Sequence, residues 1–269
     1  MGDWVERLGR EAASEGLPAL RGQLHKHGHS SAILAGSGPS LSGFNPPPGW
    51  EVFTVNHAAY HFPNSNFGCC FERLYSISEQ TKVLFVSDRG GCSGGSLLTV
   101  PLYKDGLHQR IPRPPWLHEG VRSNNMRSSD YGISTDLGRG IYLGHTSAHA
   151  AIQILDFLGV KKIYLIGIDF VNTETTHFFG EVEEKRGKER ESWFESCMDL
   201  FDNITPRYKE ERGIDLINIS PISRLREVME DASGEFYTNQ EGLGKTTEEE
   251  YEGLCRDAGR SLGYEASPA

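Results

Sequence analysis

The sequence has no long hydrophobic run. No stretch approaches the roughly 20 consecutive apolar residues that cross a bilayer, and the first residues, Met1 to Trp4, lack the basic and then apolar pattern of a secretory signal. We therefore expect a soluble, cytoplasmic protein that does not insert into membranes.

Cysteine is scarce and irregularly spaced. The five cysteines are an odd number and form no C-x-x-C pair: Cys69, Cys70, Cys92, Cys197 and Cys255. This favours neither a disulfide framework nor a zinc site, so we expect reduced, mostly structural thiols. Three alternating histidines, His25, His27 and His29, precede the first apolar run. They fit a metal site in principle, but solvated side chains are the commoner arrangement.

Positive charge is in the minority. Asp and Glu outnumber Lys and Arg by 37 to 27, for a net charge of −10, which weakens the case for general binding to nucleic acid or to an anionic membrane. The 269 residues suffice for one large domain with a buried core. We expect that domain over residues 1–229, with a lid or insertion at about 90–144 and an acidic tail at 230–269.

The expected lid is rich in Gly, Ser, Pro and Arg. A connection of this length is usually a lid, a binding segment or a disordered insertion. Its arginines are most often solvated in such segments, but near a phosphate site they would neutralise the ligand. They are Arg110, Arg113, Arg122, Arg127 and Arg139.

Apolar strands alternate with amphipathic helices along the chain. Beyond the first apolar run at 32–35, we expect strands at 51–56, 82–88, 162–170 and 215–220. A helix capped by Thr146 or Ser147 and stopped by Gly159 precedes the third of these, a helix around 193–204 precedes the last, and a docking helix covers 4–15. This alternation predicts an α/β fold with an open, doubly wound, mainly parallel sheet.

A glycine-rich turn follows the first strand. The run Ala32 to Ala35 ends in Gly36-Ser37-Gly38, and Pro39 and Ser40 are then expected to open a helix. Free N–H groups and the positive end of a helix dipole at such a turn suit a phosphate. A tight turn without a ligand is the alternative. The dinucleotide fingerprint is absent, because Leu41 stands at its third glycine and Asn56 at its ribose-binding carboxylate.

Polar residues end each expected strand. They are Gly36 to Ser40, Asn56, Ser87 with Asp88, Asp169 and Ser220. In open α/β sheets the ligand crevice lies beyond the carboxyl ends of the strands, so these groups predict a binding site, although strand ends are often polar for no such reason.

Three segments resemble the bacterial lipooligosaccharide sialyltransferases. They are Ile33 to Leu41, Phe53 to Asn56, and the block from Thr146 to Phe170. The Gly-x-Gly-Pro-Ser-Leu turn is similar also to motility accessory factor and archaeal 6-hydroxymethylpterin pyrophosphokinase-like (MptE-like) proteins. The resemblance covers about half of the chain. It implies a Rossmann-like sheet with a small lid and an inverting, metal-independent glycosyltransferase that uses CMP-activated sialic acid.

The resemblance also implies roles for residues. Gly36-Ser37-Gly38 and Asn56 would contact the nucleotide, with Ser87 near the nucleoside and Thr146-Ser147 near the donor sugar. His177 to Glu181 resembles the family segment His-aromatic-x-Gly-His, whose second histidine is the general base; Glu181 stands at that position here. The turn has Ser37 in place of the family's asparagine, and the family's phosphate-binding tyrosines are not evident after Phe170, so the donor stays open.

Three functions remain. The first is a glycosyltransferase that needs no cofactor beyond a nucleotide-sugar donor, with a CMP-linked sugar as one candidate, and moves the sugar to an acceptor hydroxyl with His177 or Glu181 as base. The second is a pyrophosphokinase in which Asp88 and Asp169 hold Mg²⁺ for ATP. The third is a nucleotide-binding module without catalysis. A homo-oligomer is compatible with each of them.

Overall fold

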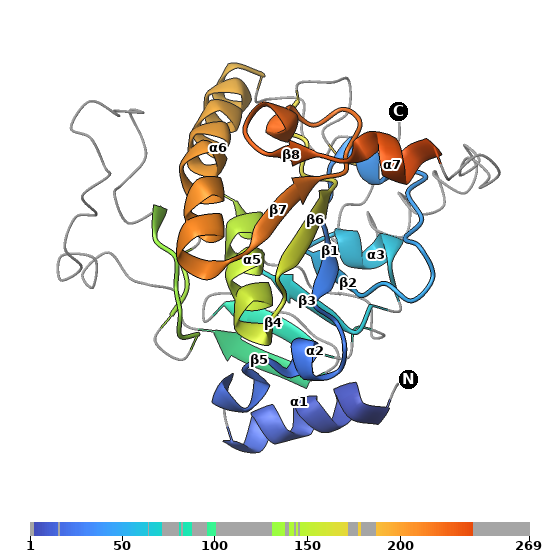
Figure 1. Ribbon diagram of the computed structural model, residues 1–269, viewed down its shortest axis with the longest axis vertical. Coiled ribbons are helices and arrows are strands. Elements are labelled where there is room, and N and C mark those ends of the chain that lie inside the picture. The colour runs from blue at the N-terminus through green and yellow to red at the C-terminus, as the bar shows by residue number, and fades with distance from the viewer. Residues whose placement is uncertain are drawn as a thin grey trace, which may run out of the picture.

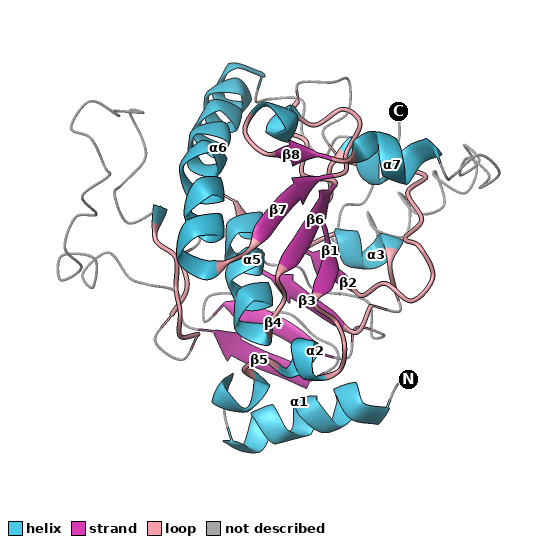
Figure 2. Ribbon diagram, in the orientation of Figure 1, coloured by secondary structure: helices cyan, strands magenta, loops and turns pink. Residues whose placement is uncertain are grey.

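A parallel eight-stranded sheet forms the centre of the molecule (Figures 1 and 2), with strand order β5-β4-β3-β2-β1-β6-β7-β8. The computed structural model describes residues 3–15, 17–63, 65–71, 81, 83–87, 96–100, 131–137, 140–142, 144, 146–171, 177–178 and 187–238. The strands are β1 Ser31–Ala35, β2 Val52–Val55, β3 Phe67–Cys70, β4 Val83–Ser87, β5 Ser96–Val100, β6 Lys162–Ile166, β7 Asp215–Asn218 and β8 Glu230–Asp231. The predicted Rossmann-like, doubly wound α/β fold is confirmed.

Helices cover both faces of this sheet. They are α1 Asp3–Glu15, α2 Gln23–Lys26, α3 Ala58–His61, α5 Ser147–Leu158, α6 Gly187–Arg207 and α7 Ser233–Thr238. Shorter helical turns are η1 Leu17–Leu20, η2 Pro39–Leu41, η4 Tyr208–Arg212 and η5 Arg224–Glu227. Apolar residues of α1, α5 and α6 share the larger core cluster, whereas those of η2, α3 and α7 pack into the smaller one on the opposite face (Figure 1). Within the described part of the chain, no helix is both long and apolar enough to span a membrane.

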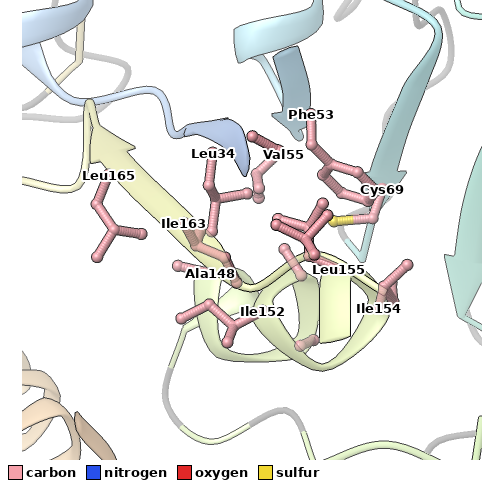
Figure 3. Packing of buried hydrophobic residues seen from close by; sticks show 14 of the residues in the cluster. Leu34, Phe53, Val55, Cys69, Ala148, Ile152, Ile154, Leu155, Ile163 and Leu165 are labelled. Carbon is pink, nitrogen blue, oxygen red and sulfur yellow. The ribbon is translucent and has the colours of Figure 1, made fainter. Parts of the chain in front are cut away.

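Helix α5 begins and ends where the sequence predicts. The Thr146 hydroxyl accepts a hydrogen bond from the Ala148 amide at 3.2 Å, and Gly159 closes the helix with a φ of 95°. A hydroxyl cap and a left-handed glycine each satisfy backbone groups that a helix end leaves open. The predicted stripe is buried: Ile152 and Leu155 pack under β1, β2 and β3, toward residues such as Leu34, Val55 and Phe53 (Figure 3).

The sheet is wider than predicted. Strands β3, β5 and β8 have no counterpart in the expectation, and β5 lies inside the segment expected to be a lid. β8 pairs with β7 beyond residue 229, where we expected the acidic tail to begin. These are short strands: β3 contains a glycine, and β8 is two acidic residues, so neither carries a hydrophobic period that a sequence pattern can register.

Strand β6 is shorter than predicted. It ends at Ile166 rather than at Phe170, because Gly167 turns the chain with a φ of 66°. Such a backbone conformation breaks the extended strand and favours glycine. The residues after it, up to Asp169, therefore form a turn at the edge of the sheet.

Candidate functional site

The predicted strand tips meet at one edge of the sheet. β1 lies between β2 and β6, with Ala35 opposite both Thr54 and Ile166, and β7 follows β6. Because all these strands run in parallel, the turn at 36–40, Asn56, Asp169 and Ser220 emerge at the same carboxyl edge. Ser87 ends β4, three strands from β1. Asp88 lies outside the described residues.

The turn after β1 packs against the turn after β6. The N–H of Gly36 donates to the Ile166 carbonyl at 2.8 Å, and the N–H of Gly38 donates to the Gly167 carbonyl at 2.7 Å. A Cβ at Gly36 would lie 2.4 Å from the Gly167 oxygen, and one at Gly38 would lie 2.5 Å from a carboxylate oxygen of Asp169. These glycines are thus required for the close approach of the two turns. Two of the N–H groups that we expected to bind an anion instead donate to protein carbonyls.

The helix expected at Pro39 is a single turn. Residues Pro39–Leu41 make one 3₁₀ turn, η2, and the chain then leaves through Ser42 in a non-helical conformation. The Ser42 N–H donates back to the Pro39 carbonyl, which closes this single turn. The predicted helix start at Pro39 is thus present, but as a single 3₁₀ turn, so the part of the anion-site argument that rested on a helix dipole does not hold here.

Asp169 occupies the place that an anion would take at this turn. Its Oδ2 accepts the Ser40 N–H at 2.9 Å, and its Oδ1 accepts the hydroxyls of Ser40 at 2.7 Å and Ser220 at 2.6 Å. The side chain is buried, and burial raises the pKa of the carboxyl against the opposing effect of the serine hydrogen bonds. The Ser40 hydroxyl also accepts the Gly167 N–H at 3.0 Å. The carboxylate therefore joins the ends of β1, β6 and β7.

Asn56 connects β2 to the start of α5. It adopts a φ of 51°, which a non-glycine residue rarely does, and its N–H donates to the Cys69 carbonyl at 2.9 Å. Its side-chain oxygen accepts the Phe71 N–H at 3.1 Å, and its amide nitrogen donates to the Ser147 hydroxyl at 3.3 Å. Thr146 and Ser147, both half-buried, lie at the N-terminus of α5. The predicted residues Asn56, Thr146 and Ser147 are thus brought together.

His177 lies over the same edge, against α3. Its ring faces that of His57, with centroids 6.4 Å apart and planes at 69°. The next residue, Phe178, donates its N–H to the Ser37 carbonyl at 3.0 Å and contacts the ring of His61. Glu181, the other candidate base, lies outside the described residues.

His57 and His61 were not predicted as site residues. The sequence offers little signal for them: they come shortly after Asn56 and are four residues apart, at the two ends of one short helix. His57 is 8% exposed, and burial, together with the charge of His177, lowers its pKa to about 4. His57 is therefore a neutral imidazole at neutral pH.

The described residues contain no group of three or more His, Cys, Asp or Glu side chains placed to hold a metal ion. The three histidines before β1 lie at the amino edge, opposite the site. There the ring of His27 stacks on Trp4, with centroids 3.9 Å apart, and that of His29 lies 6.2 Å from the same indole.

The fold and the site together define an α/β protein with a polar carboxyl edge built from β1, β2, β6 and α5. No family model matches the chain, and no curated protein matches it in sequence. Among solved structures it is similar to the sialyltransferase CstII from Campylobacter jejuni in complex with the substrate analogue CMP-3FNeuAc, at 16% identity and a TM-score of 0.38, over 75% of this chain and 86% of that one. It is similar also to the monofunctional α-2,3-sialyltransferase Cst-I from the same organism, at 15% identity and a TM-score of 0.34, over 75% of this chain and 80% of that one. Likenesses this low carry no argument about activity.

Proposed function

We propose that the protein is a glycosyltransferase that uses a nucleotide-sugar donor. The observation that carries the proposal is the contact between Asn56 and Ser147, which joins the tip of β2 to the N-terminus of a twelve-residue helix at the carboxyl edge. The sequence resemblance of the 146–170 block to the lipooligosaccharide sialyltransferases supports the same class.

The donor phosphate is assigned to the start of α5 rather than to the turn after β1. The turn donates the N–H groups of Gly36, Gly38 and Ser40 to protein oxygens. Helix α5 has three full turns, so its dipole presents positive charge at Thr146 and Ser147, and positive charge there favours an anion. The nucleoside would then lie along the tips of β2, β3 and β4, toward Ser87.

The transfer is an attack by the acceptor hydroxyl on the anomeric carbon. The bond from the acceptor oxygen to that carbon forms while the bond from the carbon to the phosphate oxygen breaks, with inversion. His177 takes the hydroxyl proton, and the nucleotide leaves with the electron pair on its phosphate. The helix N-terminus stabilises the departing phosphate, which is where most of the rate acceleration of such a site arises. Glu181 remains the alternative base.

Asp169 has a structural role in this proposal: it holds the neighbouring strand ends together and takes no part in the transfer. Both of its oxygens accept hydrogen bonds from Ser40 and Ser220, and its side chain is buried. A carboxylate held in this way is poorly disposed to coordinate Mg²⁺, which takes oxygen ligands in near-octahedral geometry. The pyrophosphokinase hypothesis, which needs Asp169 as a ligand, therefore has less support than the transferase.

A thermal-shift panel tests the proposal. CMP, CDP, UDP, GDP, ADP and ATP are each added with and without Mg²⁺, because a ligand that binds only the folded state raises the melting temperature. We expect a metal-independent response, with CMP the first nucleotide to try, followed by assays with the matching nucleotide sugar. A response to ATP alone that requires Mg²⁺ would support the kinase. Binding without turnover of any donor would support the non-catalytic module.

A charge placed at Ser147 locates the phosphate. Ser147→Asp sets a carboxylate against the bound phosphate, but a negative charge in the first turn of a helix stabilises the free protein. We therefore expect a folded variant in which the nucleotide-induced shift is lost. Ser192→Asp, at an exposed position in α6, is the matched control and should respond like the parent protein. An undiminished shift in Ser147→Asp would place the phosphate elsewhere.

A further inference from the structure

Histidines at the two ends of helix α3 contact residues 177 and 178. Its N-cap, His57, and its last residue, His61, are four positions apart and so lie on one side of the helix. The ring of His57 contacts that of His177, and the ring of His61 lies 5.5 Å from that of Phe178. Two successive residues of one distant loop are thus each held by one histidine of α3.

From these two ring contacts we infer that His57 is a positioning residue, which orients the imidazole of His177 toward the acceptor hydroxyl in the proposed transfer. The inference rests on the proposed function, because it concerns the base of that reaction. His57 itself does not touch the reacting atoms; it acts through His177.

Phe178 fixes where His177 lies along the edge. The Phe178 N–H donates to the Ser37 carbonyl at 3.0 Å, and its side chain is only 4% exposed, within the smaller core cluster. His61, against which it packs, is itself held by a contact of its Nε2 with the Phe44 carbonyl at 3.1 Å. The backbone at 177 is therefore tied to the turn after β1, and the contact with the ring of His57 bears on the rotation of the His177 side chain.

His57 restricts that rotation. An edge-to-face pair of aromatic rings has a preferred geometry, and the two imidazoles meet with their planes at 69°. His57 is in turn fixed by its own burial and by its place at the start of α3, beside the ring of Tyr60 at 6.1 Å. A buried ring of this kind presents one fixed edge or face to its neighbour.

The two histidines also have different environments, which separates their roles. Burial, with the charge of His177 as a second cause, lowers the pKa of His57 to about 4. The buried imidazole thus stays neutral when its more exposed neighbour takes a proton. Pairs of titratable groups whose environments differ in this way divide the acid and base roles between them. His57 therefore does not take up the proton that is removed from the acceptor.

Asn56 and His57 are adjacent, so one short segment sets both halves of the site. Asn56 contacts Ser147, where we place the donor phosphate, and His57 contacts the base. The left-handed backbone at Asn56 determines the direction in which the two side chains leave the chain. The spacing between donor and base is thereby built into the end of β2.

Two substitutions at His57 test the inference by activity. His57→Ala removes the ring, and we expect kcat to fall about tenfold or more, while the KM for the donor changes by less than about twofold, since a misplaced base costs rate rather than binding. His57→Phe keeps a neutral ring and should recover most of the lost kcat. His25→Ala, exposed at the opposite edge, is the control. A His57→Phe variant as slow as His57→Ala, or a fully active His57→Ala, would overturn the inference.

A second measurement does not depend on turnover. The His57 side chain is titrated by NMR in the parent protein and in His177→Gln. Because the charge of His177 helps to lower the pKa of His57, we expect that pKa to rise from about 4 when His177 is replaced. An unchanged titration would overturn the contact between the rings. Failure of every nucleotide to bind or react, together with the expected rise, would reject the transferase but keep the pairing of His57 with His177.

Discussion

Ser40 and Asp169 are joined by two hydrogen bonds although 129 residues separate them in the chain. The Asp169 carboxylate accepts the Ser40 N–H at 2.9 Å through one oxygen and the Ser40 hydroxyl at 2.7 Å through the other. A third hydrogen bond comes from Ser220, after β7. One buried side chain after β6 therefore satisfies polar groups at the ends of β1 and β7, and the arrangement of these three strand ends depends on it.

Replacement of Asp169 should destabilise the fold strongly. Asp169→Ala leaves the Ser40 N–H and two serine hydroxyls without their acceptor in a buried place, and an unsatisfied buried donor costs about 1–3 kcal/mol. We expect the free energy of unfolding to fall by about 2–4 kcal/mol, which urea unfolding measures. Asp202→Ala, exposed on α6, is the control and should change it by less than about 0.5 kcal/mol. A loss at Asp169 no larger than in the control would contradict the structural role.

Gly38 should tolerate no side chain. A Cβ there would lie 2.5 Å from Asp169 Oδ2 and 2.8 Å from the Gly167 carbonyl oxygen, so the two turns must separate to accommodate it. We expect Gly38→Ala to lower the free energy of unfolding by about 2–3 kcal/mol, again by urea unfolding. A Cβ at Gly234, in α7, meets nothing within 4 Å, so Gly234→Ala is a matched control. Equal stability of the two variants would refute the close packing of the turns.

The sheet could be predicted from the sequence because its central strands carry long apolar runs. β1 and β6 each have several fully buried residues, and α5 has a complete stripe with a cap at each end. Strands β3, β5 and β8 could not be found in this way. β3 contains a glycine, β5 follows directly on a glycine pair, and β8 is two acidic residues, so none of them stands out as an apolar run. Each is a strand because a neighbouring strand offers hydrogen bonds.

The site was predicted in outline but not in its chemistry. The sequence indicated which polar residues end the strands, and the structure brings Asn56 together with Ser147 and Ser40 together with Asp169. It did not indicate that the amides after β1 would donate to a neighbouring turn, because that depends on the distance between two turns far apart in the chain. The place of His57 was missed for the same reason, since its partner is 120 residues further along.

His149 should make the protein sensitive to acid. It lies fully buried in the first turn of α5, neither ring nitrogen has a hydrogen-bond partner among the described residues, and burial lowers its pKa from 6.5 to about 3, aided by the charge of Arg207. The unfolded chain therefore binds the proton first as the pH falls. The contribution of neutral His149 to the free energy of unfolding should be fully present above about pH 6.5. It should fall by about 1 kcal/mol per pH unit as the pH is lowered toward 3.

The variant His149→Leu isolates this effect. It removes the titrating group and an unsatisfied polar side chain, so we expect a flatter dependence of the urea midpoint on pH between 4 and 8 and no loss of stability at pH 7. His25→Leu, at an exposed position, should keep the parent dependence. The same acid sensitivity in His149→Leu as in the parent protein would assign it to other groups.

Gln153 should hold the segment before α5 in place. Its side chain is fully buried in α5; its oxygen accepts the N–H groups of Ser134 and Tyr142 at 3.1 Å each, and its nitrogen donates to the Tyr142 carbonyl at 2.7 Å. Gln153→Leu fits the same volume but leaves three backbone groups of segment 131–142 unsatisfied. We expect a loss of about 2–4 kcal/mol in the free energy of unfolding and faster proteolytic cleavage within 131–142 under native conditions. The comparison variant is Gln23→Leu in α2, which loses one hydrogen bond to the Ala19 carbonyl and should cost about 1 kcal/mol. Cleavage of 131–142 at the parent rate in Gln153→Leu would show that the apolar contacts of Tyr131 and Leu137 suffice to hold the segment.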